Sequence, residues 1–119
     1  MQVKQWNQQF EGAPSEEALR QRFKGQEYRV AKSTYRAPLR FSGVMGPGMC
    51  YVLKGACRYA FKDEAATLRA GEFCETPGGD YDFEVVGAGE AIVVKIWHMP
   101  TLFARAGIPW PPQGGDAAG

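Results

Sequence analysis

The side chains that could do chemistry in this sequence are few. His98 is the sole histidine, and its reference pKa near neutrality suits a general acid or base. Tyr81 could also move a proton, or donate a hydrogen bond to a ligand oxygen. Arg40 could hold a carboxylate or phosphate through two guanidinium donors, and Arg36 is its rival on the same strand face. These residue types suit acid–base chemistry on a small anionic molecule.

Each of these candidates also has a structural explanation. Tyr59, Tyr81 and Phe83 could line a ligand cavity or simply fill an apolar core. Cys50 is expected to face inward as a ligand contact, but a nucleophilic cysteine needs a base or a positive field, and the sequence identifies no such partner. The 3 cysteines form no CxxC pair, which indicates buried, reduced thiols.

The last predicted strand, residues 90–98, has two faces that compete for the protein interior. Alternation puts His98 on one face with Val94 and Ile96, and puts Lys95 and Trp97 on the other. Only one face can look inward, and the sequence leaves open which one. A lone histidine at a strand end is more often structural or exposed than functional.

The segments that must position these side chains are short. The chain has 15 glycines and 8 prolines, which separate apolar runs as expected of an all-β protein with frequent turns. Strands are predicted over residues 28–32, 35–41, 49–53, 57–61, 67–70, 73–75, 81–86 and 90–98. Residues 43–48 are predicted to form a mobile loop.

Residues 73–86 predict a strand, a tight turn and a second strand. In the second strand, alternation places Tyr81 and Phe83 on the same apolar face as Val85, while Asp80 and Asp82 face water. Upstream, Ser15 can cap a short helix that Gly25 ends. We expect that helix to pack on the outside of the β-structure.

Length and charge restrict the functions that are possible. A chain of 119 residues forms one domain, and a net charge of +1 argues against nucleic-acid binding. No apolar run approaches a membrane span and the N-terminus has no signal-peptide core, so we expect a cytoplasmic protein without a membrane partner. We divide it into an N-terminal arm and helix (1–26), a barrel (27–100) and a partly disordered extension (101–119).

Two motifs resemble those of the cupins. The run 51–55, YVLKG, resembles the end of the first cupin motif, and 68–72, LRAGE, followed by 77–79, PGG, resembles the second. Gly55 and Gly71 lie 16 positions apart, which also fits the family. The resemblance implies an all-β cupin-type double-stranded β-helix, a small jelly-roll barrel, with the short helix added at its N-terminal side.

The resemblance also implies where a metal would bind, and none of the family's ligands carries over. Gly48 stands where the glutamate of the first motif would fall. The second-motif histidine position is occupied by Tyr81, or by Asp82 if a one-residue gap is allowed, and strand alternation favours Tyr81. We therefore expect no metal and no other cofactor.

Two functions from different classes follow. The favoured one is a metal-independent cupin that binds a small molecule or peptide in its barrel, as an accessory protein of a biosynthetic pathway. The alternative is a metal-free lyase, dehydratase or isomerase in which Tyr81 or His98 moves a proton while Arg40 holds an anionic group. A third interpretation is a purely structural cupin dimer. The resemblance implies a homodimer, with Trp6, Phe10 and Trp110 available to cover sheet edges.

Overall fold

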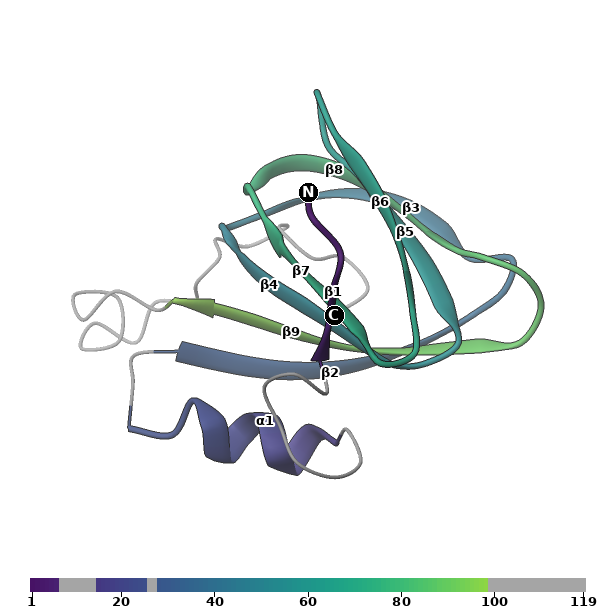
Figure 1. Ribbon diagram of the computed structural model, residues 1–119. Helices are drawn as coiled ribbons and strands as arrows, with labels where there is room; N and C mark the ends of the chain where they lie inside the picture. Colours follow the sequence, from purple (N-terminus) through teal and green to yellow (C-terminus); the bar gives the residue numbers. More distant parts are fainter. Residues whose placement is uncertain (7–14, 26–27, 99–119) are drawn as a thin grey trace.

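The structure is a computed structural model, which describes residues 1–6, 15–25 and 28–98 (Figure 1). The predicted extension, Phe10 and Trp110 lie outside the described residues. The elements are β1 (Lys4–Gln5), α1 (Glu16–Arg22), β2 (Tyr28–Arg36), β3 (Arg40–Met45), β4 (Gly48–Lys54), β5 (Ala56–Ala60), β6 (Ala65–Arg69), β7 (Glu72–Thr76), β8 (Gly79–Val85) and β9 (Glu90–His98). Within these residues no helix has the length and apolarity to cross a membrane.

The strands form two antiparallel sheets that face each other. One sheet has five strands in the order β1-β7-β4-β9-β2, and the other has four in the order β3-β8-β5-β6. Figure 1 shows the chain passing back and forth between them, so that strands distant in sequence become neighbours. The eight strands β2 to β9, interleaved in this way, make a jelly roll, to which the two-residue β1 is added at one edge. The predicted all-β, cupin-type jelly-roll fold with a short N-terminal helix is confirmed.

The space between the sheets is filled by the inward faces of both. We call this cluster the barrel interior; its buried residues are Tyr35, Met45, Cys50, Val52, Cys57, Tyr59, Leu68, Cys74, Tyr81, Phe83, Val85, Ala91 and Val93. Alternation explains its composition, because every second residue of a strand points the same way. The predicted inward face of β8, with Tyr81 and Phe83, is confirmed, as is the exposed face with Asp80 and Asp82.

A second apolar layer covers the other face of the five-stranded sheet. We call it the outer layer; its buried residues are Trp6, Leu19, Tyr51, Phe73, Val94 and Ile96. Helix α1 lies alongside β2 (Figure 1) and contributes Leu19, which is completely buried. The predicted helix and its external packing are thus confirmed.

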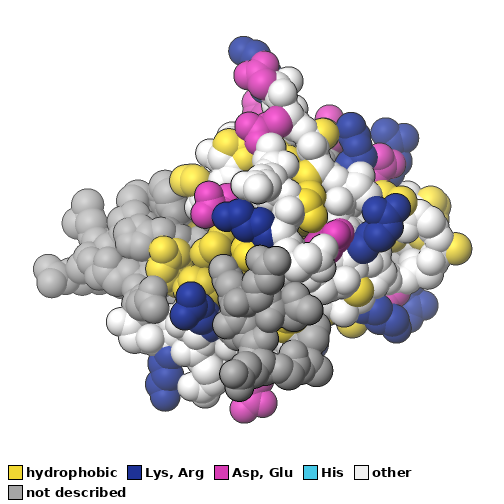
Figure 2. All heavy atoms as spheres, viewed as in Figure 1, with side chains coloured by type: hydrophobic (Ala, Val, Ile, Leu, Met, Phe, Trp, Pro, Cys, Tyr) yellow, Lys and Arg dark blue, Asp and Glu magenta, His cyan; other side chains and the backbone are white. Residues whose placement is uncertain are grey.

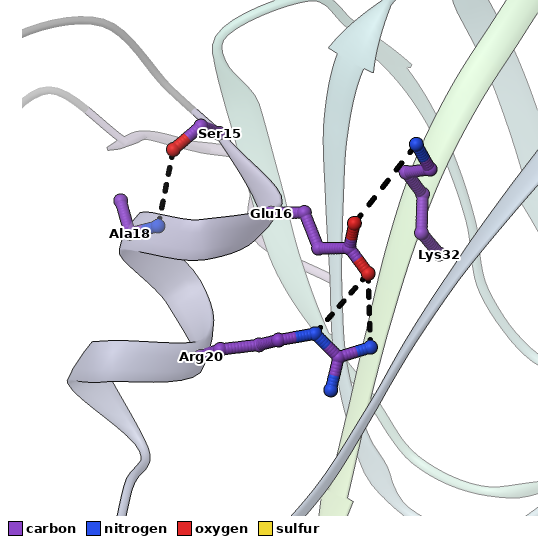
Figure 3. A network of polar contacts seen from close by, with 5 residues as sticks. All are labelled: Ser15, Glu16, Ala18, Arg20 and Lys32. Carbon is purple, nitrogen blue, oxygen red and sulfur yellow. Dashed lines mark hydrogen bonds and ion pairs between the residues drawn. The ribbon is translucent and has the colours of Figure 1, made fainter.

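Polar contacts fix the start of α1 and join it to the sheet (Figure 3). The Ser15 hydroxyl accepts a hydrogen bond from the Ala18 backbone amide at 3.0 Å, which satisfies one of the free amides of the first turn. Arg20 donates to Glu16 at 2.9 Å, and Lys32 of β2 lies 3.9 Å from the same carboxylate. These exposed ion pairs orient the helix more than they stabilise it.

The predicted boundaries between residues 28 and 48 were wrong. Residues 28–36 form one continuous strand, the turn lies at Ala37–Pro38, and residues 43–45 belong to β3 instead of a mobile loop. Pairing with β8 explains the difference, since Val44 is the register partner of Asp80 and Met45 of Gly79. That long-range pairing overrides the local turn preference of the glycines.

Candidate functional site

Lys95 lies on the face of β9 that looks into the barrel. It is only 4% exposed, and its register partners are Ala31 of β2 and Cys50 of β4. Its Nζ donates a hydrogen bond to the Tyr35 hydroxyl at 3.2 Å and lies 5.8 Å from the centre of the Tyr35 ring. Burial lowers the pKa of the Lys95 amine to about 8, although the nearby Cys50 acts in the opposite direction. A substantial fraction of the amine is therefore neutral at physiological pH.

Tyr81 reaches the barrel interior from the opposite sheet. It is 3% exposed, and its hydroxyl is buried without a hydrogen-bond partner among the described residues. Burial raises the pKa of this phenol, and the neighbouring Tyr35 and Cys50 raise it further. The hydroxyl therefore stays protonated at neutral pH, as a donor with nothing in the described structure to receive its proton.

Cys50 and Tyr59 complete the polar part of the interior. The Tyr59 hydroxyl hydrogen-bonds the Cys50 sulfur, whereas Tyr81 has no such partner among the described residues. Burial, and next the adjacent Cys74, raise the pKa of Cys50 to about 12 in spite of the opposing effects of Tyr59 and Lys95. Cys50 is thus a thiol at neutral pH, and a nucleophilic role for it finds no support.

These groups lie at one end of the barrel. Cys50 follows closely after the turn between β3 and β4, and Tyr81 follows closely after the turn between β7 and β8. The two turns touch: a Cβ atom built on Gly78 would lie 2.8 Å from the Pro47 nitrogen. Lys95 is opposite Cys50 across the β4–β9 pair. We call this the Lys95 end.

Aromatic rings line the interior beside the polar groups. Their centroids lie 4.7 to 6.0 Å apart in a contiguous set made of Tyr35, Phe41, Tyr59, Phe61, Tyr81 and Phe83. Phe83 is among the most central of them, 2% exposed and against Tyr35, Phe41 and Tyr59. The structure therefore brings four of the six sequence candidates together here: Cys50, Tyr59, Tyr81 and Phe83.

Arg40 is elsewhere. Its side chain lies on the outer face of the four-stranded sheet, 79% exposed, with its Nε 3.8 Å from a Glu84 carboxylate oxygen. It borders a surface depression of about 300 Å³ that also includes Ser42, Arg58 and Asp82. Arg36, its rival, is 84% exposed. On the face seen in Figure 2, cationic and anionic side chains are interspersed, with no large area of one sign among the described residues.

His98 occupies the last position of β9, and its side chain is outside the described part of the chain. Its backbone partner is Tyr28. Val94 and Ile96, which alternate in step with it, belong to the outer layer. No described contact brings His98 to the barrel interior.

The residues present do not fit the metal site of the cupin motifs. A Cβ built on Gly48, where the motif glutamate would fall, would lie 2.2 Å from the Ile96 carbonyl oxygen, so no side chain can project there. Tyr81 occupies the place expected for the histidine, as a protonated phenol. No cluster of three or more His, Cys, Asp or Glu side chains suited to a metal occurs among the described residues. Burial raises the pKa values of the three thiols, so the described interior offers protonated thiols and hydroxyls and one amine in place of the imidazole and carboxylate ligands of the motifs.

Sequence reasoning did not single out Lys95 as a candidate, although the structure places it in the barrel interior. The signal was present in the alternation of the last strand, which separated Lys95 from His98. Which face looks inward was decided by the packing of α1 against the opposite face, where Val94 and Ile96 lie. A lysine inside an otherwise apolar strand is itself unusual, because burying a cation is costly.

No protein-family model matches the chain, and comparison with curated proteins yields no match either. Among solved structures it resembles the EutQ protein of Clostridium difficile (17% identity, TM-score 0.47, covering 57% of this chain and 55% of that one). It also resembles the ethanolamine utilization protein Q of Salmonella typhimurium LT2 (16% identity, TM-score 0.49, covering 60% of this chain and 58% of that one). A third similar structure is a cupin-2 domain protein of Shewanella frigidimarina NCIMB 400 (17% identity, TM-score 0.36, covering 56% of this chain and 66% of that one).

The matched region is little more than half of each EutQ chain. With TM-scores below 0.5, these partial overlaps say nothing about activity. The chain's own strand order, with β7-β4-β9-β2 facing β3-β8-β5-β6, is what defines its architecture. The protein has a cupin-type jelly-roll fold.

Proposed function

We propose that this protein is a metal-independent cupin that binds a small molecule inside its barrel, at the Lys95 end. The observation that carries the proposal is the Tyr81 hydroxyl, which is buried in the interior with no hydrogen-bond partner among the described residues. Leaving a buried donor unsatisfied costs roughly 1–3 kcal/mol. A phenylalanine would fill the same space without that penalty. A hydroxyl at this position is explained if a bound ligand accepts a hydrogen bond from it.

The neighbouring groups indicate what such a ligand must offer. Lys95 supplies a second donor and Tyr35 a third polar atom, while the surrounding rings are apolar. The ligand should carry one or two acceptor oxygens on an apolar body, and it should be small, because the aromatic rings around the site pack against one another. A peptide would need more main-chain partners than these three groups supply, so a small molecule is the better candidate.

The alternative is a metal-free lyase, dehydratase or isomerase. It is supported by Lys95 and Tyr35 as acid–base residues instead of the expected Tyr81 and His98. The Lys95 amine and the Tyr35 hydroxyl are in hydrogen-bond contact, and the amine has a pKa of about 8. Burial raises the pKa of the Tyr35 phenol, so of this pair the Lys95 amine is the group that can take up or release a proton near neutral pH, with the protonated phenol beside it. In this version, Lys95 and Tyr35 take the roles that the sequence had suggested for Tyr81 and His98.

A fragment screen by thermal shift tests the proposed site. Small oxygen-bearing aromatic fragments should raise the melting temperature of the wild-type protein, and Tyr81→Phe should reduce those shifts at least severalfold. Tyr51→Phe is the matched control, because it removes a tyrosine hydroxyl from the outer layer, where that group contacts Met49. Arg40→Ala tests the outer surface and should leave the shifts unchanged. Equal shifts in wild type and Tyr81→Phe, with loss in Arg40→Ala, would move the site out of the barrel.

A cytoplasmic location, a homodimer and a place as accessory protein in a biosynthetic pathway stay predictions. The three cysteines are free and buried, which suits a reducing compartment. Among the described strands, β2 lies at one edge of the five-stranded sheet, and β3 and β6 at the edges of the other. The β7 edge is covered from within the same chain by β1, and Trp6 packs beside Tyr51, so these residues need no second copy to be buried.

A further inference from the structure

We infer that the barrel holds a carbonyl compound, a small aldehyde or ketone with an apolar body, and that Lys95 joins it covalently as an imine. This rests on the proposed function, since it names the ligand class and the chemistry of the same site. The geometry that points to it is an interior amine in contact with a phenol, in a cluster that also contains a second phenol, whose hydroxyl has nothing to donate to among the described residues.

Lys95 has the properties of a nucleophilic amine. It is 4% exposed, its Nζ is 3.2 Å from the Tyr35 hydroxyl, and it lies opposite a thiol instead of a carboxylate in the β4–β9 register. A desolvated lysine carries a larger neutral fraction than one in water, and only the neutral amine has the lone pair needed for attack. Exposed lysines such as Lys54, which pairs with Glu90 at 3.3 Å, lack this environment.

The reaction requires two tasks, which we assign to Tyr35 and Tyr81. Tyr35 is in direct contact with the amine and can pass protons between nitrogen and oxygen. Tyr81 lies within electrostatic reach of Tyr35 and Cys50, the residues that flank Lys95. We assign its hydroxyl, which has no hydrogen-bond partner among the described residues, to donate to the carbonyl oxygen, which develops negative charge as the amine attacks.

The step balances without any oxidant or reductant. The lone pair of neutral Lys95 forms a C–N bond to the carbonyl carbon, and the C=O π pair moves to oxygen. Tyr35 protonates that oxygen and takes a proton from nitrogen, giving a carbinolamine. The C–O bond then breaks, the hydroxyl leaves as water with a proton from Tyr35, and the remaining N–H proton returns to Tyr35. The sum is amine plus carbonyl giving imine plus water.

Reductive trapping tests the inference directly. Full-length protein is incubated with benzaldehyde or butanal and sodium cyanoborohydride at neutral pH, and each lysine is followed by peptide mass spectrometry. Lys95 should be alkylated at least tenfold faster than Lys32 or Lys54 of the same molecule. Lys54→Met should leave the rate at Lys95 unchanged. Tyr35→Phe should lower it about tenfold or more, as expected for loss of a proton-transfer partner.

The controls separate this inference from the proposed function. If Lys95 stays unmodified while the exposed lysines react, the imine chemistry is wrong. The barrel site then survives only if oxygen-bearing fragments without a carbonyl group still give shifts that depend on Tyr81. If Lys95 is alkylated selectively but equally fast in Tyr35→Phe, imine formation stands and the role of Tyr35 is wrong. Lys95→Met, which replaces the amine with an apolar side chain of similar length, should abolish the interior adduct.

Discussion

The two faces of one sheet carry apolar layers of different character. Strand β9 contributes to both: Val94 and Ile96 enter the outer layer, while Val93 and Lys95 enter the barrel interior. In the outer layer, packing under α1 is dominated by apolar contacts such as the stack of Tyr51 on Phe73, with centroids 4.7 Å apart. In the interior, three tyrosines, three thiols and an amine share the space with apolar groups.

The difference in residue type between the two layers indicates that the outer layer serves stability, whereas the barrel interior contains groups that stability alone does not explain. A layer selected only for stability would place no amine in its centre, because burying a cation is costly, and would leave no hydroxyl unsatisfied. At Leu19, Val94 and Ile96 the outer layer contributes purely apolar side chains. The interior departs from that rule at Lys95 and Tyr81. Departures of this kind are expected where a protein binds a ligand or performs chemistry.

The largest expected effect belongs to the outer layer. Leu19→Ala removes a completely buried side chain that joins α1 to the sheet. We expect the free energy of unfolding to fall by about 3 kcal/mol, from lost apolar burial and an unfilled cavity. Urea denaturation measures it. Arg20→Ala, on the exposed side of the same helix, should cost under about 0.5 kcal/mol. Fragment shifts in the surviving folded protein should be unchanged, and their loss would show that the two layers are not separable.

Lys95→Met should change the free energy of unfolding in the opposite direction and raise it at neutral pH. The pKa of Lys95 is lowered in the folded state from 10.5 to about 8, so between these pH values the unfolded chain binds more protons. Burying Lys95 therefore destabilises the wild-type protein most below pH 8, where the amine is charged. This destabilisation becomes smaller as the pH rises across the window. Lys95→Met should be the more stable protein at pH 7. Its advantage should shrink by on the order of 2 kcal/mol by pH 10.

Urea titrations of both proteins at several pH values measure this difference. The buried tyrosines and cysteines also titrate at high pH, but they are present in both proteins and largely cancel. Of these, Tyr35 on β2 and Cys50 on β4 contact or face the amine. A difference between the two proteins that does not vary with pH would mean that Lys95 is hydrated like a surface lysine.

The smallest expected effect compares two tyrosines of the interior. Tyr59→Phe removes a hydroxyl that hydrogen-bonds Cys50 and should lower stability by about 1 kcal/mol. Tyr81→Phe removes a hydroxyl without a partner among the described residues and should leave stability unchanged or raise it by up to about 1 kcal/mol. Both are 97% or more buried, so they are matched in burial. A loss of stability in Tyr81→Phe as large as in Tyr59→Phe would mean that its hydroxyl has a structural partner.

Sequence patterns predicted the interior faces where one side of a strand is apolar and the other charged. Strand β8 is the clearest case, since Asp80 and Asp82 alternate with Tyr81 and Phe83. Strand β9 gave no such contrast, because both of its faces are buried, and the position of α1 decides which one meets the barrel interior. The strand from Arg40 to Met45 was misjudged because its glycine and its turn-like neighbours are held extended by β8, a partner distant in sequence. Arg40 then falls on the exposed face by the same pairing, opposite Glu84.

Side-chain NMR with a bound fragment tests the central claim most directly, that the Lys95 end of the barrel interior is the ligand site. Spectra of protein labelled at lysine, tyrosine and leucine side chains are recorded with and without the fragment that gives the largest thermal shift. The account predicts changes at Lys95, Tyr35 and Tyr81, with little change at Leu19 and Tyr51 of the outer layer. Changes confined to the outer layer or to the outer face around Arg40, with Lys95 and Tyr81 unperturbed, would contradict it.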